Sequence, residues 1–291
     1  MEATGKLVIG TAQFGQHYGI TNKSGKVNKS EIGLIFKKAR ANQVDTLDTA
    51  SSYGNSERVL GLLGVSDFNI ITKLPLFDSI PSDIQKVYEK AMRSSLERLN
   101  LSSVDTVLLH RPEDLLGAHG ERIFEALKNL KEKGLTSKIG ISIYAPDILD
   151  QIYDKFFFDV IQAPINVFDR RIISSGWLDK LFDMNVTTIA RSIFLQGILL
   201  SEISSLPSYF HNWMPELLNW QKFCKANNIS LMQGCLHFVG NNPQIEKIIV
   251  GVVSESQFQE VLTAANQPVD FDPVDLESKE LGLISPLYWR A

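Results

Sequence analysis

The segment 104–142, VDTVLLHRPEDLLGAHGERIFEALKNLKEKGLTSKIGIS, contains the unit whose repetition decides the fold of this chain. It begins with an apolar run, Val104–His110, in which apolar and polar residues do not alternate, as is typical of a parallel strand buried on both faces. A helical pattern follows over Gly120–Lys133 and ends at Gly134, and a second apolar run occupies Lys138–Ser142. The segment therefore predicts two parallel strands joined by a helix.

The same alternation extends over the whole chain of 291 residues. The predicted strands are Lys6–Thr11, Thr46–Thr49, Asn69–Lys73, Val104–His110, Lys138–Ser142, Asp159–Ala163, Thr187–Arg191 and Lys247–Val252. Among the helices, we expect a short one at Asn55–Leu63, longer ones at Ser174–Met184 and Pro215–Asn227, and an extra helix at Ser230–Phe238 before the last strand. The pattern predicts an α/β fold, a (β/α)8 TIM barrel formed by residues 1–291 as a single domain. The alternative is a doubly wound sheet, but the Gly-x-Gly-x-x-Gly sequence that would favour it is missing after the first strand.

Composition and charge exclude several classes of protein. Hydrophobic residues make up 44% of the chain and charged residues 21%, as in globular proteins, so a disordered or fibrous chain is excluded. The net charge of −4 argues against nucleic acid or an anionic membrane as a partner. We expect neither a signal peptide nor a membrane span, because no basic stretch precedes an apolar one at the N-terminus and no long apolar window exists. Cys224 and Cys235 lack metal-ligand spacing and fit a reducing compartment, so we expect a cytoplasmic protein.

Ionisable side chains of different types occur where the predicted strands end. Asp48 and Tyr53 follow the second strand, Lys73 the third and His110 the fourth. Each residue alone could be a turn cap, a packing residue or a surface side chain. Because the C-terminal ends of neighbouring barrel strands meet at one rim, however, we expect these four side chains to lie close together.

Such a set suits proton transfer to a carbonyl oxygen during reduction. A tyrosine with a pKa of about 10 is a weak acid at neutral pH unless a cation stabilises its phenolate, and Lys73 could supply that charge. Asp48 could keep Lys73 charged, and His110 could donate a hydrogen bond to the substrate carbonyl. None of these residues can deliver a hydride, so the chemistry requires a nicotinamide cofactor.

The stretch Asp48–Gly61, DTASSYGNSERVLG, resembles the signature of the aldo-keto reductase family. The resemblance continues, in the family's order, at Gly10-Thr11, Ile71-Thr72-Lys73, Leu108-Leu109-His110-Arg111-Pro112, Gly140-Ile141-Ser142 and Gln162. It implies a barrel that binds NADPH in an extended form over its mouth, without a separate dinucleotide-binding domain. It also implies that Tyr53 is the general acid, that Lys73 and Asp48 adjust its acidity, and that His110 positions the carbonyl.

The same resemblance assigns positions to the cofactor. Ser142 and Gln162 match residues that hold the nicotinamide carboxamide, Ser192–Gly197 matches a pyrophosphate loop, and Gly251–Glu260 matches the adenosine-phosphate site. The individual cofactor-binding residues implied are Gly10, Thr11, Ser142, Gln162, Arg191, Ser192, Phe194, Gln196, Gly197, Gly251, Ser254, Gln257 and Glu260. No metal site is implied. A metal-dependent hydrolase or a barrel isomerase has little support, since His110 alone among five histidines lies at an inward strand end.

The sequence departs from the family pattern at positions that would contact the cofactor. Ile143 and Val261 stand where many members have asparagine, and Arg191 stands where many stack an aromatic ring on the nicotinamide. The family commonly reads the 2′-phosphate of NADPH with Lys or Arg near the start of the last helix, but Gly251–Gln257 contains no cation and one carboxylate, Glu255. We expect NADPH as the cofactor, with NADH or use of both left open, since a Lys or Arg from elsewhere could reach the phosphate.

The match also suggests which residues meet the substrate. The substrate-lining positions that it implies are Phe14, Tyr18, Arg111, Tyr144 and Asn166, with Phe168, Tyr209, Phe210 and Trp213 as further candidates. Aromatic faces with polar groups suit sugars and aromatic carbonyls alike, and the run 209–213 could equally be a packed loop. The opening GTAQFG and the run ARSIFLQGILL resemble a bacterial subgroup often found near cell-surface polysaccharide genes, which suggests a sugar-type carbonyl.

The sequence therefore predicts an NAD(P)H-dependent oxidoreductase that reduces a small-molecule aldehyde or ketone to an alcohol. The alternative, from a different class, is a non-catalytic NAD(P)-binding barrel acting as a sensor or binding protein. The intact set of Asp48, Tyr53, Lys73 and His110 favours the enzyme, and the departures at the adenosine site favour the alternative. No heptad pattern is present, so the sequence predicts no particular oligomeric state.

Overall fold

The eight predicted strands form a closed parallel barrel. The structure is a computed structural model that describes residues 3–77, 82–269, 271 and 276–289. Its strands are β1 (Leu7–Gly10), β2 (Thr46–Asp48), β3 (Asn69–Lys73), β4 (Val104–Leu109), β5 (Thr136–Ser142), β6 (Val160–Pro164), β7 (Thr187–Arg191) and β8 (Lys247–Gly251). Each strand pairs in parallel with the next, and β1 pairs with β8 to close the barrel. The predicted (β/α)8 barrel is confirmed.

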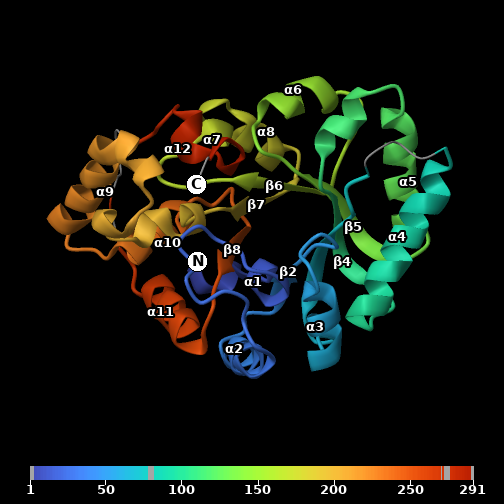
Figure 1. Cartoon of the computed structure of the whole chain (residues 1–291). Helices are drawn as coiled ribbons and strands as arrows, with labels where there is room; N and C mark the ends of the chain where they lie inside the picture. The colour runs from blue at the N-terminus through green and yellow to red at the C-terminus, as the bar shows by residue number, and fades with distance from the viewer. Residues whose placement is uncertain (1–2, 78–81, 270, 272–275, 290–291) are drawn as a thin grey trace.

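Helices surround the barrel on its outside (Figure 1). The longer ones are α2 (Lys29–Ala41), α3 (Ser56–Leu63), α4 (Ile84–Leu99), α5 (Gly120–Glu132), α6 (Asp147–Ile152), α8 (Trp177–Asp183), α9 (Met214–Ala226), α10 (Leu231–Gly240) and α11 (Glu255–Asn266). Short helices and 3-10 turns are α1 (Ala12–Gly15), α7 (Arg171–Ser174), α12 (Leu281–Ile284), η1 (Ala3–Lys6), η2 (Pro112–Leu116), η3 (Leu195–Leu200), η4 (Ile203–Ser205), η5 (Ser208–Trp213) and η6 (Pro286–Tyr288). The extra helix predicted before the last strand is α10. It begins with a capping box, in which Ser230 and Gln233 each accept the other's backbone N–H.

One predicted helix, Ser174–Met184, is divided in the structure. α7 ends at Ser174 and α8 begins at Trp177, because Gly176 between them has a left-handed backbone conformation with φ 76°. Glycine adopts this conformation without steric cost and commonly ends a helix. The helical periodicity of the segment hides the break, so the sequence prediction joined two elements into one.

Side chains fill the barrel, so it is a packed core rather than a pore. Ile71, Leu108, Val160 and Ile189 form one buried apolar cluster, to which β3, β4, β6 and β7 contribute, and Ile249 of β8 packs against it. A second and larger apolar cluster joins the strands to the surrounding helices. With its interior occupied, the barrel leaves its mouth as the place for a ligand.

Both cysteines and one histidine are buried in the packed interior, away from the barrel mouth. Cys224 and Cys235 are buried free thiols, and burial raises the pKa of Cys224 to about 12. His237 is also buried, and its Nε2 lies 3.0 Å from the carbonyl oxygen of Ala264. In the described part of the chain, no helix is both long and apolar enough to cross a membrane.

Candidate active site

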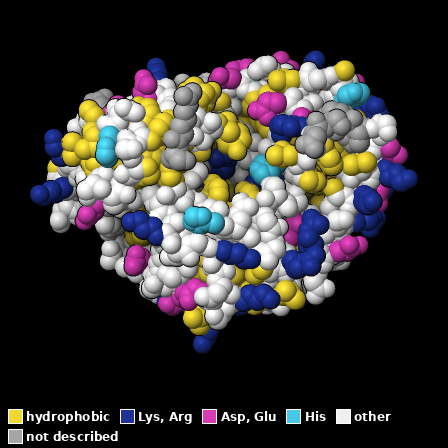
Figure 2. All heavy atoms as spheres, viewed as in Figure 1, with side chains coloured by type: hydrophobic (Ala, Val, Ile, Leu, Met, Phe, Trp, Pro, Cys, Tyr) yellow, Lys and Arg dark blue, Asp and Glu magenta, His cyan; other side chains and the backbone are white. Residues whose placement is uncertain are grey.

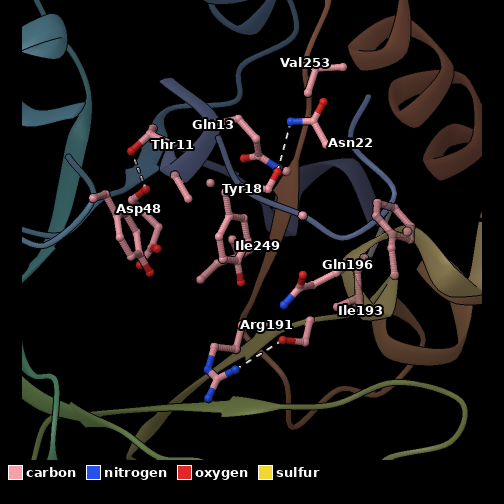
Figure 3. A pocket seen from close by; sticks show the side chains of 18 of the residues that line it. Thr11, Gln13, Tyr18, Asn22, Asp48, Arg191, Ile193, Gln196, Ile249 and Val253 are labelled. Atoms are coloured by element: carbon pink, nitrogen blue, oxygen red, sulfur yellow. Dashed lines mark hydrogen bonds between the residues drawn. The ribbon is translucent and has the colours of Figure 1, made fainter. Parts of the chain in front are cut away.

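A cavity of about 580 Å³ opens at the C-terminal ends of the strands. Figure 2 shows a hollow in this face of the molecule with hydrophobic side chains gathered around it, and Figure 3 shows the cavity from close by. Asp48, Tyr53 and His110 line it together with Ser142 of β5 and Gln162 of β6. Its volume is in the range of small-molecule and cofactor sites, about 300–1,000 Å³.

Lys73 and Asp48 form a buried ion pair at one side of the cavity. Lys73 Nζ lies 2.7 Å from both carboxylate oxygens of Asp48 and donates a hydrogen bond to the Thr49 carbonyl at 3.0 Å. The lysine side chain is 1% exposed, and this burial lowers the pKa of Lys73 while the Asp48 carboxylate opposes the shift. β2 and β3 are neighbours in the barrel, which is why their ends place the two side chains together.

Tyr53 and His110 lie next to this ion pair. Lys73 Nζ is 5.1 Å from the centre of the Tyr53 ring, and the Tyr53 and His110 rings meet edge to face at 6.2 Å. Burial, and then the charge of Asp48, raises the pKa of Tyr53 above its ordinary value. Burial, assisted by the charges of Lys73 and Arg191, lowers the pKa of His110 to about 4. At neutral pH the site therefore contains a protonated phenol and a neutral imidazole.

Arg191 adds a second cation to the Lys73 charge that was expected to favour the phenolate. Burial first, and then the Asp48 carboxylate beside Lys73, raises the pKa of Tyr53. The cation that opposes this increase is Arg191. Lys73 is largely neutralised by its partner, whereas Arg191 has no carboxylate within ion-pair distance among the described residues.

Ser142 and Gln162 form a polar pair that is hydrogen-bonded to the Asp48 carboxylate, as Lys73 is. The Ser142 hydroxyl donates to Gln162 Oε1 at 3.0 Å, and Gln162 Nε2 donates to Asp48 at 2.8 Å. A primary amide has two N–H donors and two acceptor lone pairs, so Gln162 keeps one of each for a ligand. The remaining N–H donor and lone pair are complementary to another amide group. The sequence resemblance assigns such a group, the nicotinamide carboxamide, to Ser142 and Gln162.

Arg191 at the end of β7 extends along the cavity. Its guanidinium lies 4.7 Å from the centre of the Tyr144 ring and donates hydrogen bonds to the Ile143 carbonyl at 2.8 Å and to Ser192 Oγ at 3.2 Å. A planar cation held in this way by an aromatic ring and a carbonyl is fixed in orientation.

A segment in which only Tyr18 was predicted as a site residue borders the cavity beside the loop after β7. Residues 16–25 follow α1, and we call them the strap. Ile20 N donates to Gln196 Oε1 at 3.1 Å, and Thr21 Oγ1 donates to the Gln196 carbonyl at 2.9 Å. Thr21, Asn22, Lys23 and Ser24 of the strap line the cavity, as do the predicted residues Phe194, Gln196 and Gly197. Turn glycines at positions 19 and 25, both with positive φ, were the signal available in the sequence.

Other predicted site residues line the cavity as expected. These are Gly10, Thr11, Tyr18, Tyr144, Arg191, Ser192, Gly251 and Gln257. Val261, noted as a departure, and Val253, within the run that lacks a cation, line the cavity together with Gln257 of α11.

Two predicted substrate residues are structural instead. Phe14 is fully buried and packs edge to face on the Phe36 ring, because the short helix α1 turns it into the core. The Asn166 side chain accepts the Phe168 and Asp169 N–H groups and donates to the Ser192 carbonyl, so it stabilises a turn. Neither is among the described residues that line the cavity.

Further predicted residues also lie away from it. Arg111 pairs with Asp114 and donates to the Phe77 carbonyl. Ser254 caps α11, and Glu260 is exposed on that helix. The additional candidates in the loop after β7 pack on the C-terminal segment, as the Tyr209 hydroxyl shows by donating to the Gly282 and Tyr288 carbonyls. This loop is the packed one that the sequence analysis left open.

Comparison with known proteins agrees with this geometry. A model of the aldo/keto reductase family matches residues 6–276. An uncharacterized oxidoreductase of Bacillus subtilis is 28% identical over 196 residues, which are 63% of this chain and 62% of that protein, so the match spans under two thirds of the relative's length. L-galactose dehydrogenase of Arabidopsis thaliana is 27% identical over 262 residues, 84% of this chain and 80% of that protein. Among solved structures, the holo form of an aldo-keto reductase from Bacillus halodurans superposes with a TM-score of 0.73 at 19% identity, covering 91% and 88% of the two chains.

Proposed function

The chain belongs to the aldo/keto reductase family of oxidoreductases, and from this premise we propose that it reduces an aldehyde or ketone to an alcohol, with Tyr53 as the proton donor and NAD(P)H as the hydride donor. The observation that supports this most directly is that Tyr53, His110 and the buried Lys73–Asp48 pair meet at one cavity. Members of the family generally use NAD(P)H, which suits a site whose own side chains cannot transfer a hydride.

The residues present fit a nicotinamide nucleotide. Gln162 retains a donor and an acceptor for the carboxamide, and Ser142 beside it adds a hydroxyl. The loop 192–197 borders the same cavity with left-handed backbone at Ser192, Gln196 and Gly197, which brings its backbone close to the open space. When bound there, the nucleotide supplies a hydride to the carbonyl carbon of the substrate.

Tyr53 would complete the reduction by giving up its proton. As the carbonyl carbon gains a C–H bond, the π electron pair moves to the oxygen, and the proton of the Tyr53 hydroxyl moves to that oxygen. The raised pKa of Tyr53 keeps the hydroxyl protonated until this charge develops. Arg191 and Lys73, whose charged form the Asp48 carboxylate favours, stabilise the phenolate that remains.

His110 would orient the carbonyl as a neutral donor. Its Nδ1 lies 3.3 Å from Ser52 Oγ, and if that nitrogen accepts the hydroxyl hydrogen, the ring hydrogen is on Nε2. Because the pKa of His110 is lowered, the imidazole does not take up a second proton at neutral pH and keeps one N–H donor. The imidazole therefore polarises the substrate oxygen without competing with Tyr53 as the acid.

Titration of the purified protein with NADPH and with NADH, followed by quenching of its tryptophan fluorescence, tests the proposal together with turnover on a panel of aldehydes and ketones. We expect binding of at least one nucleotide and its oxidation by at least one carbonyl. Binding of nucleotide without turnover on a broad panel would favour a sensor or binding protein. Binding of neither nucleotide would contradict the proposal.

For the substrate, we propose a sugar-type carbonyl. Tyr18, Tyr144 and Ser52 bring hydroxyl groups to the cavity near Tyr53, and Arg191 adds unused N–H donors, so a polyhydroxylated carbonyl would find several partners. One relative, L-galactose dehydrogenase, is named for a sugar. A higher kcat/KM for aldoses than for aromatic aldehydes of similar size is expected, and the reverse order would contradict this choice.

A further inference from the structure

We propose that Lys23, on the strap of residues 16–25, pairs with the 2′-phosphate of NADPH and makes the protein selective for NADPH over NADH. This inference rests on the proposed function, in which the nicotinamide lies at Ser142 and Gln162. NADPH and NADH differ only in one phosphate, so a side chain that touches only this group would change the affinity for one nucleotide and not for the other.

The start of α11 does not offer a place for that phosphate. The first backbone N–H groups of a helix usually attract anions, but here protein groups already use two of them. The N–H of Glu255 donates to Glu31 Oε1 at 2.5 Å, and that of Gln257 donates to Ser254 Oγ at 3.1 Å. Two carboxylates, Glu31 and Glu255, therefore lie at this helix end, and Lys38 is already paired with Glu255. A phosphate placed here would meet two carboxylates and a lysine that is already paired with one of them.

The strap supplies a cation on another wall of the same cavity. Lys23 lines the cavity together with Gln257 and Val261 of α11, its side chain is exposed, and no carboxylate among the described residues forms an ion pair with it. Within the described lining, the Lys and Arg side chains are those of Lys23 and Arg191. Figure 3 draws Asn22, the residue before Lys23, at one end of the cavity with Val253, and Arg191 at the other end. The two cations therefore serve opposite ends of an extended ligand.

The backbone on both sides of Lys23 is held in place. The Asn22 side chain makes four hydrogen bonds within the strap: Nδ2 donates to the carbonyls of Tyr18 and Gly25, and Oδ1 accepts the N–H groups of Ser24 and Gly25, at distances from 2.9 to 3.1 Å. The bonds of Ile20 and Thr21 to Gln196 hold the strap against the loop after β7. Only the Lys23 side chain itself must become ordered on binding, which keeps the entropic cost of the contact low.

The test compares the dissociation constants of NADPH and NADH for the wild type, Lys23→Ala, Lys23→Glu and the control Lys29→Ala. Lys29 is an exposed lysine at the start of α2 that does not line the cavity, so its replacement makes the same change in net charge. Fluorescence quenching gives the constants, and thermal melting confirms that the variants are folded. For an exposed lysine paired with phosphate, we expect NADPH to bind roughly five- to twentyfold more weakly to Lys23→Ala. The loss should be larger for Lys23→Glu, with less than about a twofold change for NADH in either variant.

Salt provides a second readout. Because an exposed charge pair is screened by ions, the preference of the wild type for NADPH should decrease as salt increases, and that dependence should be nearly absent in Lys23→Ala. Equal weakening of both nucleotides in Lys23→Ala would mean that the lysine contacts a part common to both, and would overturn the inference. So would unchanged NADPH binding, although the proposed function would stand in either case. Failure of the wild type to bind either nucleotide would instead remove the proposed function itself, and this inference with it.

Discussion

Asp48 accepts hydrogen bonds from Lys73 Nζ at 2.7 Å and from Gln162 Nε2 at 2.8 Å, so one buried carboxylate connects the proposed proton donor's lysine to the glutamine proposed to hold the carboxamide. After burial, the same carboxylate is the next cause that raises the pKa of Tyr53. A single anion thus holds the lysine, accepts a hydrogen bond from the glutamine and adds to the effect of burial that keeps the tyrosine protonated. Its replacement should change both the stability of the barrel and the acidity of the site.

Asp48→Asn should destabilise the protein. The change leaves the Lys73 ammonium buried without its counter-charge, and breaking such a pair costs roughly 3–5 kcal/mol of unfolding free energy. Urea unfolding measures the loss. Asp67→Asn is the matched control, because Asp67 pairs with Arg40 on the surface and should lose at most about 1 kcal/mol. Similar small losses in the two variants would show that Lys73 does not depend on Asp48.

His110 should make stability depend on pH in the acidic range. Its pKa is lowered from 6.5 to about 4 by burial and by the nearby cations. Between pH 4 and pH 6.5, His110 is therefore protonated in the unfolded chain but neutral in the folded protein. Stability from this residue is therefore complete above pH 6.5 and decreases as pH falls toward 4. His110→Gln should reduce the slope of unfolding free energy against pH in that window, by about 1–3 kcal/mol in total. His119→Gln, at an exposed histidine, should leave the slope unchanged, and equal slopes in all three proteins would refute the assignment.

Arg191 should contribute to turnover through its charge. It is the cation that opposes the rise in the pKa of Tyr53, so its loss makes the phenolate harder to form. Arg191→Met should lower kcat about tenfold, as expected for loss of a charge-assisted contact. Arg191→Lys keeps the charge but not the planar stack on Tyr144, and it should retain more of kcat than the methionine variant. Equal kcat in both variants would assign the residue to packing alone.

Replacing Gly197 by a residue with a side chain should destabilise the protein, because the Thr21 side chain occupies the space beside it. A Cβ at position 197 would lie 2.0 Å from Thr21 Oγ1, and the backbone there has a φ of 93°. Gly197→Ala should therefore cost about 1–3 kcal/mol and loosen the strap. Thr21→Ala should recover part of that loss when combined with it, because it removes the hydroxyl that clashes but not the backbone strain. Thermal melting of the two single variants and the double variant measures this coupling, and additive effects would mean that the strap does not contact residue 197.

The sequence predicted those parts of the molecule that are determined by local sequence patterns or by the repeated alternation of strands and helices. Apolar runs gave the strands. The position of Asp48, Tyr53, Lys73 and His110 at or soon after the ends of three strands predicted that these residues meet at one rim. Gly176 escaped prediction because its left-handed conformation interrupts a periodicity that continues on both sides.

The less predictable parts depend on long-range contacts. Phe14 follows the first strand as a substrate residue might, but α1 directs it onto Phe36, about twenty positions away in the chain. The strap meets Gln196 across 175 positions or more, and no local pattern contains that pairing. The pKa of Tyr53 is likewise influenced by Arg191, a residue of β7 that was predicted only as a cofactor contact.

The most direct test of the account is the steady-state turnover of Tyr53→Phe measured beside its nucleotide dissociation constants. Removal of one hydroxyl should abolish detectable carbonyl reduction while changing nucleotide affinity by less than about threefold, since general acid catalysis contributes about 10²–10⁴-fold and binding uses other groups. Tyr153→Phe, at a buried tyrosine that packs on Trp177 away from the cavity, should keep wild-type turnover. Turnover of Tyr53→Phe at the wild-type rate would contradict the assignment of Tyr53 as the proton donor.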